Sequence, residues 1–228
     1  MNAPALALAA LLAGGPEATE RFLGVARLED GSVAYRETHL VRLRDGRVTS
    51  AETRYLDADG RPIARLVSDY EPHPFAPDYE FQDLRTGLRE ALRRDGDGVA
   101  LEDGDRVRRL PPRFERPLVA GQGLDRFARS HLAELARGEV LRVELALPGR
   151  LDTYAFRLRG EPAEGGALRV RIEPESLLLR LLAPSLEAEY DPGSGRLLRY
   201  RGVSNLAGPD GESQTVEIAY SYLDPSGS

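Results

Sequence analysis

The chain has 228 residues and a formal net charge of −6, and its charged residues make up 30 % of the sequence. All 31 basic residues are arginine, and cysteine and tryptophan are absent. This composition excludes lysine Schiff bases, P-loop lysines, thiol nucleophiles and cysteine metal sites, and the modest acidic excess argues against a nucleic-acid partner. A chain of this length buries roughly 70 % of its unfolded surface, so it can form an ordinary hydrophobic core.

Residues 1–18 contain an uncharged apolar run from Ala5 to Ala13, followed by small residues. This pattern predicts a signal peptide that is removed on export. As a helix the run spans about 14 Å, roughly half of the hydrocarbon core, so we expect no transmembrane anchor. Without a lipobox cysteine the exported chain is expected to be soluble in the periplasm and not a lipoprotein. The alternative is a short Ala/Leu helix that packs on the domain.

From Glu20 onward, short segments rich in Val, Leu, Tyr and Thr alternate between two faces. Such alternation is typical of antiparallel strands with one buried face. Dipeptides that supply a positive φ in tight hairpins separate these segments: Asp30-Gly31, Asp45-Gly46, Asp59-Gly60, Asp95-Gly96, Asp103-Gly104, Gly165-Gly166 and Asp210-Gly211. The two proline-rich stretches, Pro72 to Pro77 and Pro111 to Pro117, are expected to be loops.

Two segments have helical spacing. Gly123 to Gly138 places apolar residues on one face and ends in glycine, which predicts one amphipathic helix. Glu175 to Ala183 is a short leucine-rich segment between prolines, which predicts a second helix. The fold class is therefore mainly β, with some α: residues 20–228 form a single domain, a curved antiparallel sheet or half-open β-barrel with two helices on its concave face.

The residues that could carry chemistry do not form a recognisable site. Asp69, Glu71, His73, Asp78 and Glu80 are close in sequence, but three prolines stiffen the segment and it holds one imidazole, so we expect no metal and no cofactor.

A second candidate is Ser204, in Gly-Val-Ser-Asn-Leu. It lacks the second glycine of a hydrolase elbow and precedes a turn, which indicates a strand-end serine. A hydrolase would need His39, His73 or His131 beside Ser204, or a pair of acids.

Three stretches carry a resemblance: G-L-D-R-F-A-R-S-H-L-A-E-L (123–135), L-L-A-P-S-L-E-A-E-Y-D (181–191) and R-L-L-R-Y-R-G-V-S-N-L (196–206). They are similar to sequences of an uncharacterised family of proteobacterial exported proteins. The order of hairpins, central helix and leucine-rich helix over residues 20–222 also resembles the half-barrel of the LolA/LolB lipoprotein carriers. The resemblance implies an exported half-barrel, and the missing lipobox agrees with LolA rather than LolB.

These observations favour a non-enzymatic periplasmic binding or carrier protein for a lipid-like or other apolar ligand. The residues expected to line its site are apolar and lie on the predicted helices and one strand: Phe127, Leu132, Tyr154, Phe156, Leu178 and Leu182. The alternative is an envelope protein-interaction module that binds a partner through a sheet edge and has no ligand cavity. A serine or acid hydrolase is a third hypothesis.

Overall fold

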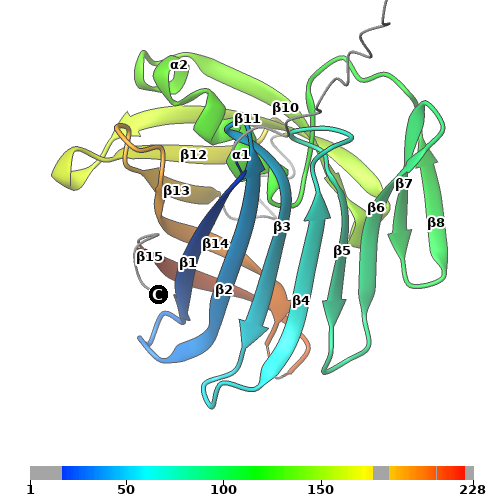
Figure 1. The fold of residues 1–228 in the computed structure, drawn as a ribbon, viewed down its shortest axis with the longest axis horizontal. Coiled ribbons are helices and arrows are strands. Elements are labelled where there is room, and N and C mark those ends of the chain that lie inside the picture. The colour runs from blue at the N-terminus through cyan, green and yellow to red at the C-terminus, as the bar shows by residue number, and fades with distance from the viewer. Residues whose placement is uncertain (1–16, 177–184, 209, 224–228) are drawn as a thin grey trace, which may run out of the picture.

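The computed structural model describes residues 17–176, 185–208 and 210–223, and these form one 15-stranded sheet (Figure 1). The strands in chain order are β1 (Glu17–Arg27), β2 (Val33–Arg44), β3 (Arg47–Leu56), β4 (Pro62–Asp69), β5 (Asp78–Asp83), β6 (Arg89–Asp95), β7 (Gly98–Asp103), β8 (Arg106–Leu110), β9 (Leu118–Ala120), β10 (Val140–Leu147), β11 (Asp152–Pro162), β12 (Leu168–Pro174), β13 (Leu186–Tyr190), β14 (Leu197–Ala207) and β15 (Ser213–Leu223).

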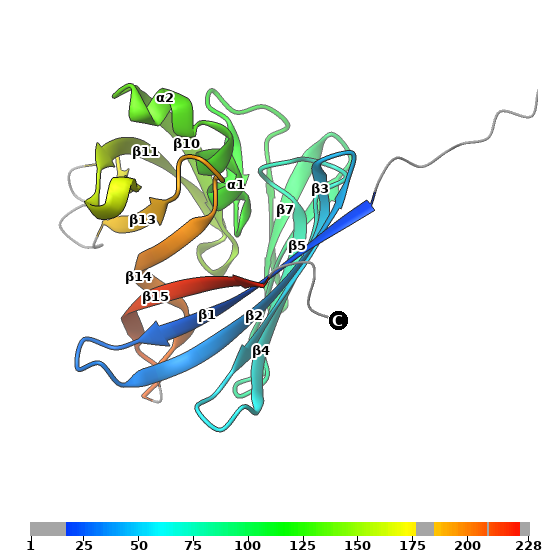
Figure 2. The same cartoon turned by 60° about the vertical axis from the view of Figure 1, so that its left-hand side comes forward.

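The order of strands in the sheet runs from β8 to β1, then from β15 to β9. Both ends of the described chain therefore meet in the middle, where β1 pairs antiparallel with β15 (Figure 2). Every pairing is antiparallel except that of β9 with β10, which is parallel. Within the described residues no hydrogen-bonded ladder joins β8 to β9. The expectation of a single curved, mainly antiparallel sheet is confirmed, and the barrel that it outlines is not closed.

The predicted turns are hairpin turns in the structure. Each predicted dipeptide contains a glycine with positive φ, and each lies between two strands that are consecutive in the chain. Asp45 also has a positive φ, of 54°, so both central residues of the β2–β3 turn are left-handed, as a type I′ hairpin requires. Pro72 to Pro77 and Pro111 to Pro117 lie between strands, as expected.

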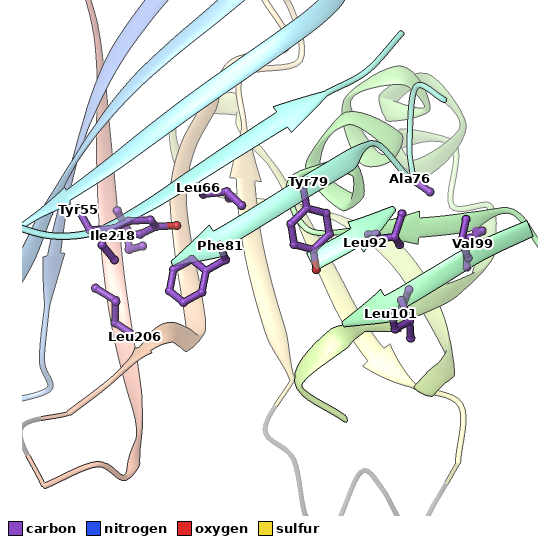
Figure 3. Close-up of a cluster of buried hydrophobic side chains, with 14 of the residues drawn as sticks. Tyr55, Leu66, Ala76, Tyr79, Phe81, Leu92, Val99, Leu101, Leu206 and Ile218 are labelled. Atoms are coloured by element: carbon purple, nitrogen blue, oxygen red, sulfur yellow. The ribbon is translucent and has the colours of Figure 1, made fainter. Parts of the chain in front are cut away.

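The inner face of the sheet carries the alternating residues that the sequence indicated. On β2, Tyr35, His39 and Val41 are buried while their neighbours point outward. The largest apolar cluster, here called the inner cluster, forms around Tyr55, Tyr79, Leu92, Leu101 and Ile218 (Figure 3).

The β9–β10 end of the sheet is buried on both faces. Leu118 and Ala120 of β9 pack in the inner cluster with Leu92 and Leu101, whereas Val119 between them packs with the helices. Since successive side chains of a strand point to opposite faces, this end of the sheet lies between the other end and the helices. The sheet is thus rolled past itself, and packing of side chains takes the place of a closing ladder.

The expected helix over 123–138 is two helices, α1 (Gly123–Ser130) and α2 (Leu132–Ala136). The break is at His131, whose φ of −124° and ψ of 22° are not helical. Ser130 Oγ donates to the carbonyls of Arg126 and Phe127, and His131 Nδ1 lies 2.8 Å from the Phe127 carbonyl. These side chains compete with backbone N–H groups for the carbonyls of the last turn, which explains the break.

The apolar faces of α1 and α2 pack on β9 to β13 in what we call the helix cluster, which includes Phe127, Leu135, Val143 and Val170. The other expected helix, Glu175 to Ala183, lies mostly outside the described residues, as does most of the predicted signal peptide. Glu17 and Ala18, which that prediction included, are already paired with β2. No helix in the described part of the chain is long and apolar enough to cross a membrane.

Candidate functional site

The residues expected to line an apolar site fall in three places. Phe127 and Leu132 are 4 % and 7 % exposed and pack inside the helix cluster. Tyr154 and Phe156 are half-buried on β11, opposite Leu145 and Val143 of β10, and Phe156 also packs against the helix cluster. Leu178 and Leu182 lie outside the described residues. The structure brings Phe127, Leu132 and Phe156 to one cluster, and their role as ligand contacts stays a prediction.

The environment of Ser204 does not supply the partner that a serine hydrolase needs. Its hydroxyl donates to the Tyr35 hydroxyl at 3.0 Å and accepts the Leu206 N–H at 2.9 Å. These contacts fix the end of β14. None of the three histidines hydrogen-bonds to Ser204 in the part of the chain that the structure describes.

His73 has a local structural contact instead. Its Nδ1 accepts the backbone N–H groups of Phe75 and Ala76, at 3.1 and 2.9 Å, so it shapes the loop after β4. Burial, together with the nearby Arg94 guanidinium, lowers the pKa of His73. Across the described ranges no group of three or more His, Asp or Glu side chains is placed to hold a metal ion.

His39 belongs to a buried polar chain that links β2, β3 and α1. Its Nε2 lies 2.9 Å from Glu37 Oε2, and its Nδ1 lies 2.9 Å from the Thr53 hydroxyl. The amide of Gln122, just before α1, donates to the same hydroxyl at 2.6 Å. With a neutral imidazole, Thr53 donates to Nδ1 and Nε2 donates to Glu37. The Thr53 hydroxyl, the His39 imidazole and the Glu37 carboxylate thus form a connected series, as a nucleophile, base and acid would. Thr53 is 0 % exposed and no substrate can reach it, so the series is structural.

A pocket of about 990 Å³ opens at the end of the half-barrel beside α1, and we call it the mouth pocket. Four segments line it: the β2–β3 hairpin, the loop after β4, α1 and the turn between β13 and β14. Its lining includes Arg44, Val48, Tyr70, Phe75, Arg126 and Arg129.

Two local features hold these segments in place. Gly123 at the start of α1 lies so close to the loop after β4 that a Cβ there would be 1.9 Å from the Phe75 carbonyl oxygen. The Phe75 ring meets the Phe127 ring edge-on, with centroids 5.3 Å apart. The loop and the helix are therefore packed directly against each other.

The apolar wall of the mouth pocket comes from two separate clusters. Val48 and Tyr70 belong to a small cluster with Phe22, Val41 and Ala51, whereas Phe75 packs against the helix cluster. The pocket thus lies at the seam between two apolar cores.

The pocket's arginines differ in their surroundings. Arg44 forms an ion pair with Glu71 at 3.0 Å. Arg129, whose side chain is 15 % exposed, lies 3.5 Å from Glu20 and 3.8 Å from Asp125. Burial by itself lowers the pKa of Arg129. The carboxylates of Asp125 and Glu20 raise this pKa by more than burial lowers it, so the net shift is upward. Arg126 and the exposed Arg47 have no carboxylate within ion-pair distance among the described residues.

Tyr70 contributes a polar group to this pocket. Its side chain is 4 % exposed, and its hydroxyl has no hydrogen-bond partner in the described part of the structure. Burial raises the pKa of Tyr70 to about 12, although the nearby Arg126 guanidinium opposes the rise. The Arg126 and Ser68 side chains approach the hydroxyl and also oppose the rise in its pKa. The hydroxyl therefore stays protonated at physiological pH.

The sequence did not predict the mouth pocket, because the site expected from it is lined by apolar residues only. The available signal was weak: Arg126 and Arg129 are three residues apart on the polar face of the predicted helix, as solvent-exposed arginines also are. Tyr70 follows directly after β4, and no feature of the sequence around it distinguishes it from other aromatic residues at strand ends. Only the fold brings these residues together.

No protein-family model matches the chain, and no curated protein matches it in sequence. A distant structural neighbour is a beta-barrel-like protein of the domain of unknown function DUF1849 from Brucella abortus, known from a crystal structure. The two chains are 9 % identical with a TM-score of 0.37, and the match covers 92 % of this chain and 98 % of that chain. Similarity at this level does not bear on what the chain binds.

Proposed function

We propose that this chain is a non-enzymatic binding or carrier protein that holds a lipid-like ligand in the mouth pocket. The observation that carries the proposal is the pocket itself, with about 990 Å³ of volume at the seam between two apolar clusters. Pockets that bind small molecules typically measure about 300–1,000 Å³ and are mainly apolar with a few polar groups.

A lipid-like ligand fits the distribution of polarity in this pocket. Val48 and Tyr70 provide apolar surface from one cluster and Phe75 from the other, and four arginines also line the pocket: Arg44, Arg47, Arg126 and Arg129. An acyl chain laid between the clusters gains about 0.8 kcal/mol for each methylene that it buries. Phe127 and Phe156, which the sequence predicted as ligand contacts, belong to or pack against the same helix cluster as Phe75, so a longer chain could extend toward them.

Carriage in the periplasm is part of the proposal and rests on the apolar run in residues 1–18. The non-enzymatic role is supported by the surroundings of the candidate nucleophiles. Ser204 hydrogen-bonds to Tyr35 and Leu206, and Thr53 is fully buried. Neither hydroxyl lines the mouth pocket.

Native mass spectrometry of the full chain, purified and then incubated with an envelope phospholipid extract and with dodecanoate, tests the proposal. We expect a one-to-one complex with at least one of these ligands. Ser194→Trp places an indole in the exposed turn at the pocket rim and should abolish the complex.

Ser32→Trp is the matched control. Ser32 also lies in a hairpin turn and donates its hydroxyl to a nearby aspartate, as Ser194 does, but its turn joins β1 to β2 away from the pocket. This variant should bind as the wild type does. Binding that survives in Ser194→Trp would exclude the mouth pocket as the site.

A protein without any bound or acquired ligand would contradict the carrier function. The alternative would then be a protein partner, and one observation favours a place for it. β8 ends the sheet, and its residues 106–109 are all exposed, so a partner strand could pair with this edge.

A further inference from the structure

The mouth pocket contains a cation whose charge is not compensated locally. Arg44 is paired with Glu71, and Arg129 lies between Glu20 and Asp125. Arg126 lines the pocket from α1, is half-buried, and has no carboxylate at ion-pair distance among residues 17–176, 185–208 and 210–223. A half-buried guanidinium without a counter-ion favours an anion beside it.

A buried hydrogen-bond donor lies next to this cation. The Tyr70 hydroxyl belongs to a side chain that is 4 % exposed and lines the same pocket, and it lacks a partner in the described structure. Leaving a buried polar group without a hydrogen bond costs roughly 1–3 kcal/mol, so such a group calls for an explanation, and a bound ligand is one. An oxygen of a bound ligand would supply the missing acceptor.

We propose that Arg126 and the Tyr70 hydroxyl together bind the anionic headgroup, a carboxylate or a phosphate, of an amphiphilic ligand. This inference rests on the proposed function and specifies the chemical class of its ligand. The headgroup oxygens accept hydrogen bonds from the guanidinium and the phenol, while the charge of Arg129 is already balanced by Glu20 and Asp125.

The position of these groups also sets the orientation of the ligand. The Tyr70 ring packs in the cluster with Phe22 and Val41, and Tyr70 also lines the pocket. The apolar chain therefore runs from the headgroup along Val48 and Phe75, while the charged end stays beside α1. An uncharged headgroup would leave the Arg126 charge without an anion.

Isothermal titration calorimetry with the full chain, below the critical micelle concentration of each amphiphile, tests this inference. The probes are dodecanoate and dodecyl phosphate, the uncharged dodecyl glycerol ether, and the free anions acetate and inorganic phosphate. We expect both anionic amphiphiles to bind at least about 10-fold more tightly than the uncharged one. The free anions should bind far more weakly because they lack the chain.

Three variants separate the contributions. Arg126→Gln should weaken binding of the anionic amphiphiles by roughly 10-fold to 100-fold and leave the uncharged one nearly unchanged. Tyr70→Phe should weaken them by roughly 3-fold to 10-fold. Arg36→Gln, on the exposed face of β2, is the control and should bind as the wild type does.

The outcomes distinguish the headgroup inference from the carrier function. Equal affinity for charged and uncharged amphiphiles would overturn the headgroup inference and leave the carrier function in place. Equal affinity for free phosphate or acetate and for the amphiphiles would keep anion recognition but contradict a lipid-like ligand. No binding of any amphiphile would contradict both.

Discussion

Replacing Thr53 by valine removes one buried hydroxyl while keeping the shape of the side chain. In the folded protein this hydroxyl contacts His39 Nδ1 at 2.9 Å and the Gln122 amide at 2.6 Å. Thr53 is 0 % exposed and His39 is 8 % exposed, so water cannot readily take the place of the hydroxyl at the imidazole. Gln122 is half-buried and can partly rehydrate.

A buried polar group that loses its partner costs about 1–3 kcal/mol. Counting the His39 nitrogen in full and the Gln122 amide in part, we expect Thr53→Val to lower the free energy of unfolding by about 2–4 kcal/mol. For a chain of this size that corresponds to a fall in Tm of roughly 4–16 °C.

The assay is urea unfolding followed by far-ultraviolet circular dichroism, because the chain has no tryptophan. The loss should appear as a lower midpoint at an unchanged slope with urea concentration. Thr49→Val is the control, since the Thr49 hydroxyl makes only a 3.3 Å contact with the Arg42 carbonyl, and it should change stability by less than about 0.5 kcal/mol.

A double substitution tests the physical reason. Thr53→Val combined with Gln122→Met replaces both partners of one hydrogen bond by apolar groups, so the combined loss should be smaller than the sum of the single losses. The reasoning is refuted if Thr53→Val costs no more than Thr49→Val, because the buried chain would then contribute nothing to stability.

Three further predictions concern pH and close packing. The pKa of His73 is lower in the folded protein, so the stability that its neutral form provides above pH 6.5 is lost as the pH falls through the folded-state pKa. His73→Asn keeps a hydrogen-bond acceptor and cannot titrate. Between about pH 7 and about pH 5 its Tm should therefore fall less than the Tm of the wild type. Burial raises the pKa of Glu90, so its charged form disfavours folding at neutral pH. Glu90→Gln should therefore raise Tm at pH 7 and lose this advantage below about pH 4.5. A lower Tm of the variant at pH 7 would contradict an upward shift of this pKa. Gly123→Ala forces a Cβ toward the Phe75 carbonyl. In urea unfolding it should lower the free energy of unfolding by about 1–3 kcal/mol, although alanine has the better helix propensity. An unchanged free energy would show that the loop and α1 are not in contact.

The strands and turns of this protein could be predicted from the sequence because both are local properties. Alternation with a period of two over residues 33–43 puts Tyr35, His39 and Val41 on one side of a strand, and in the structure all three are buried. Each Asp-Gly or Gly-Gly pair supplies the positive φ of a tight hairpin and so determines which strands are neighbours. A meander built from such hairpins follows directly, and the curved sheet with it.

The helical segment shows where a local pattern stops being sufficient. Apolar spacing over 123–138 predicted one helix, but hydrogen bonds from Ser130 and His131 to the carbonyls of the preceding turn divide it. The sequence contained both residues, but a periodicity of apolar positions does not report how side chains compete for carbonyls.

Rolling of the sheet was decided only by tertiary packing. β9 is buried on both faces because the inner cluster covers one face and the helices cover the other, and no sequence period specifies which distant strands provide that cover. The mouth pocket depends on the same step. Arg44, Tyr70 and Arg126 come from three separate segments, and each resembles an ordinary residue of its own element until the rolled sheet places α1 against the ends of β2 to β4. The sequence by itself determined strands, turns and neighbours, while the long-range packing of apolar faces decided where the mouth pocket lies.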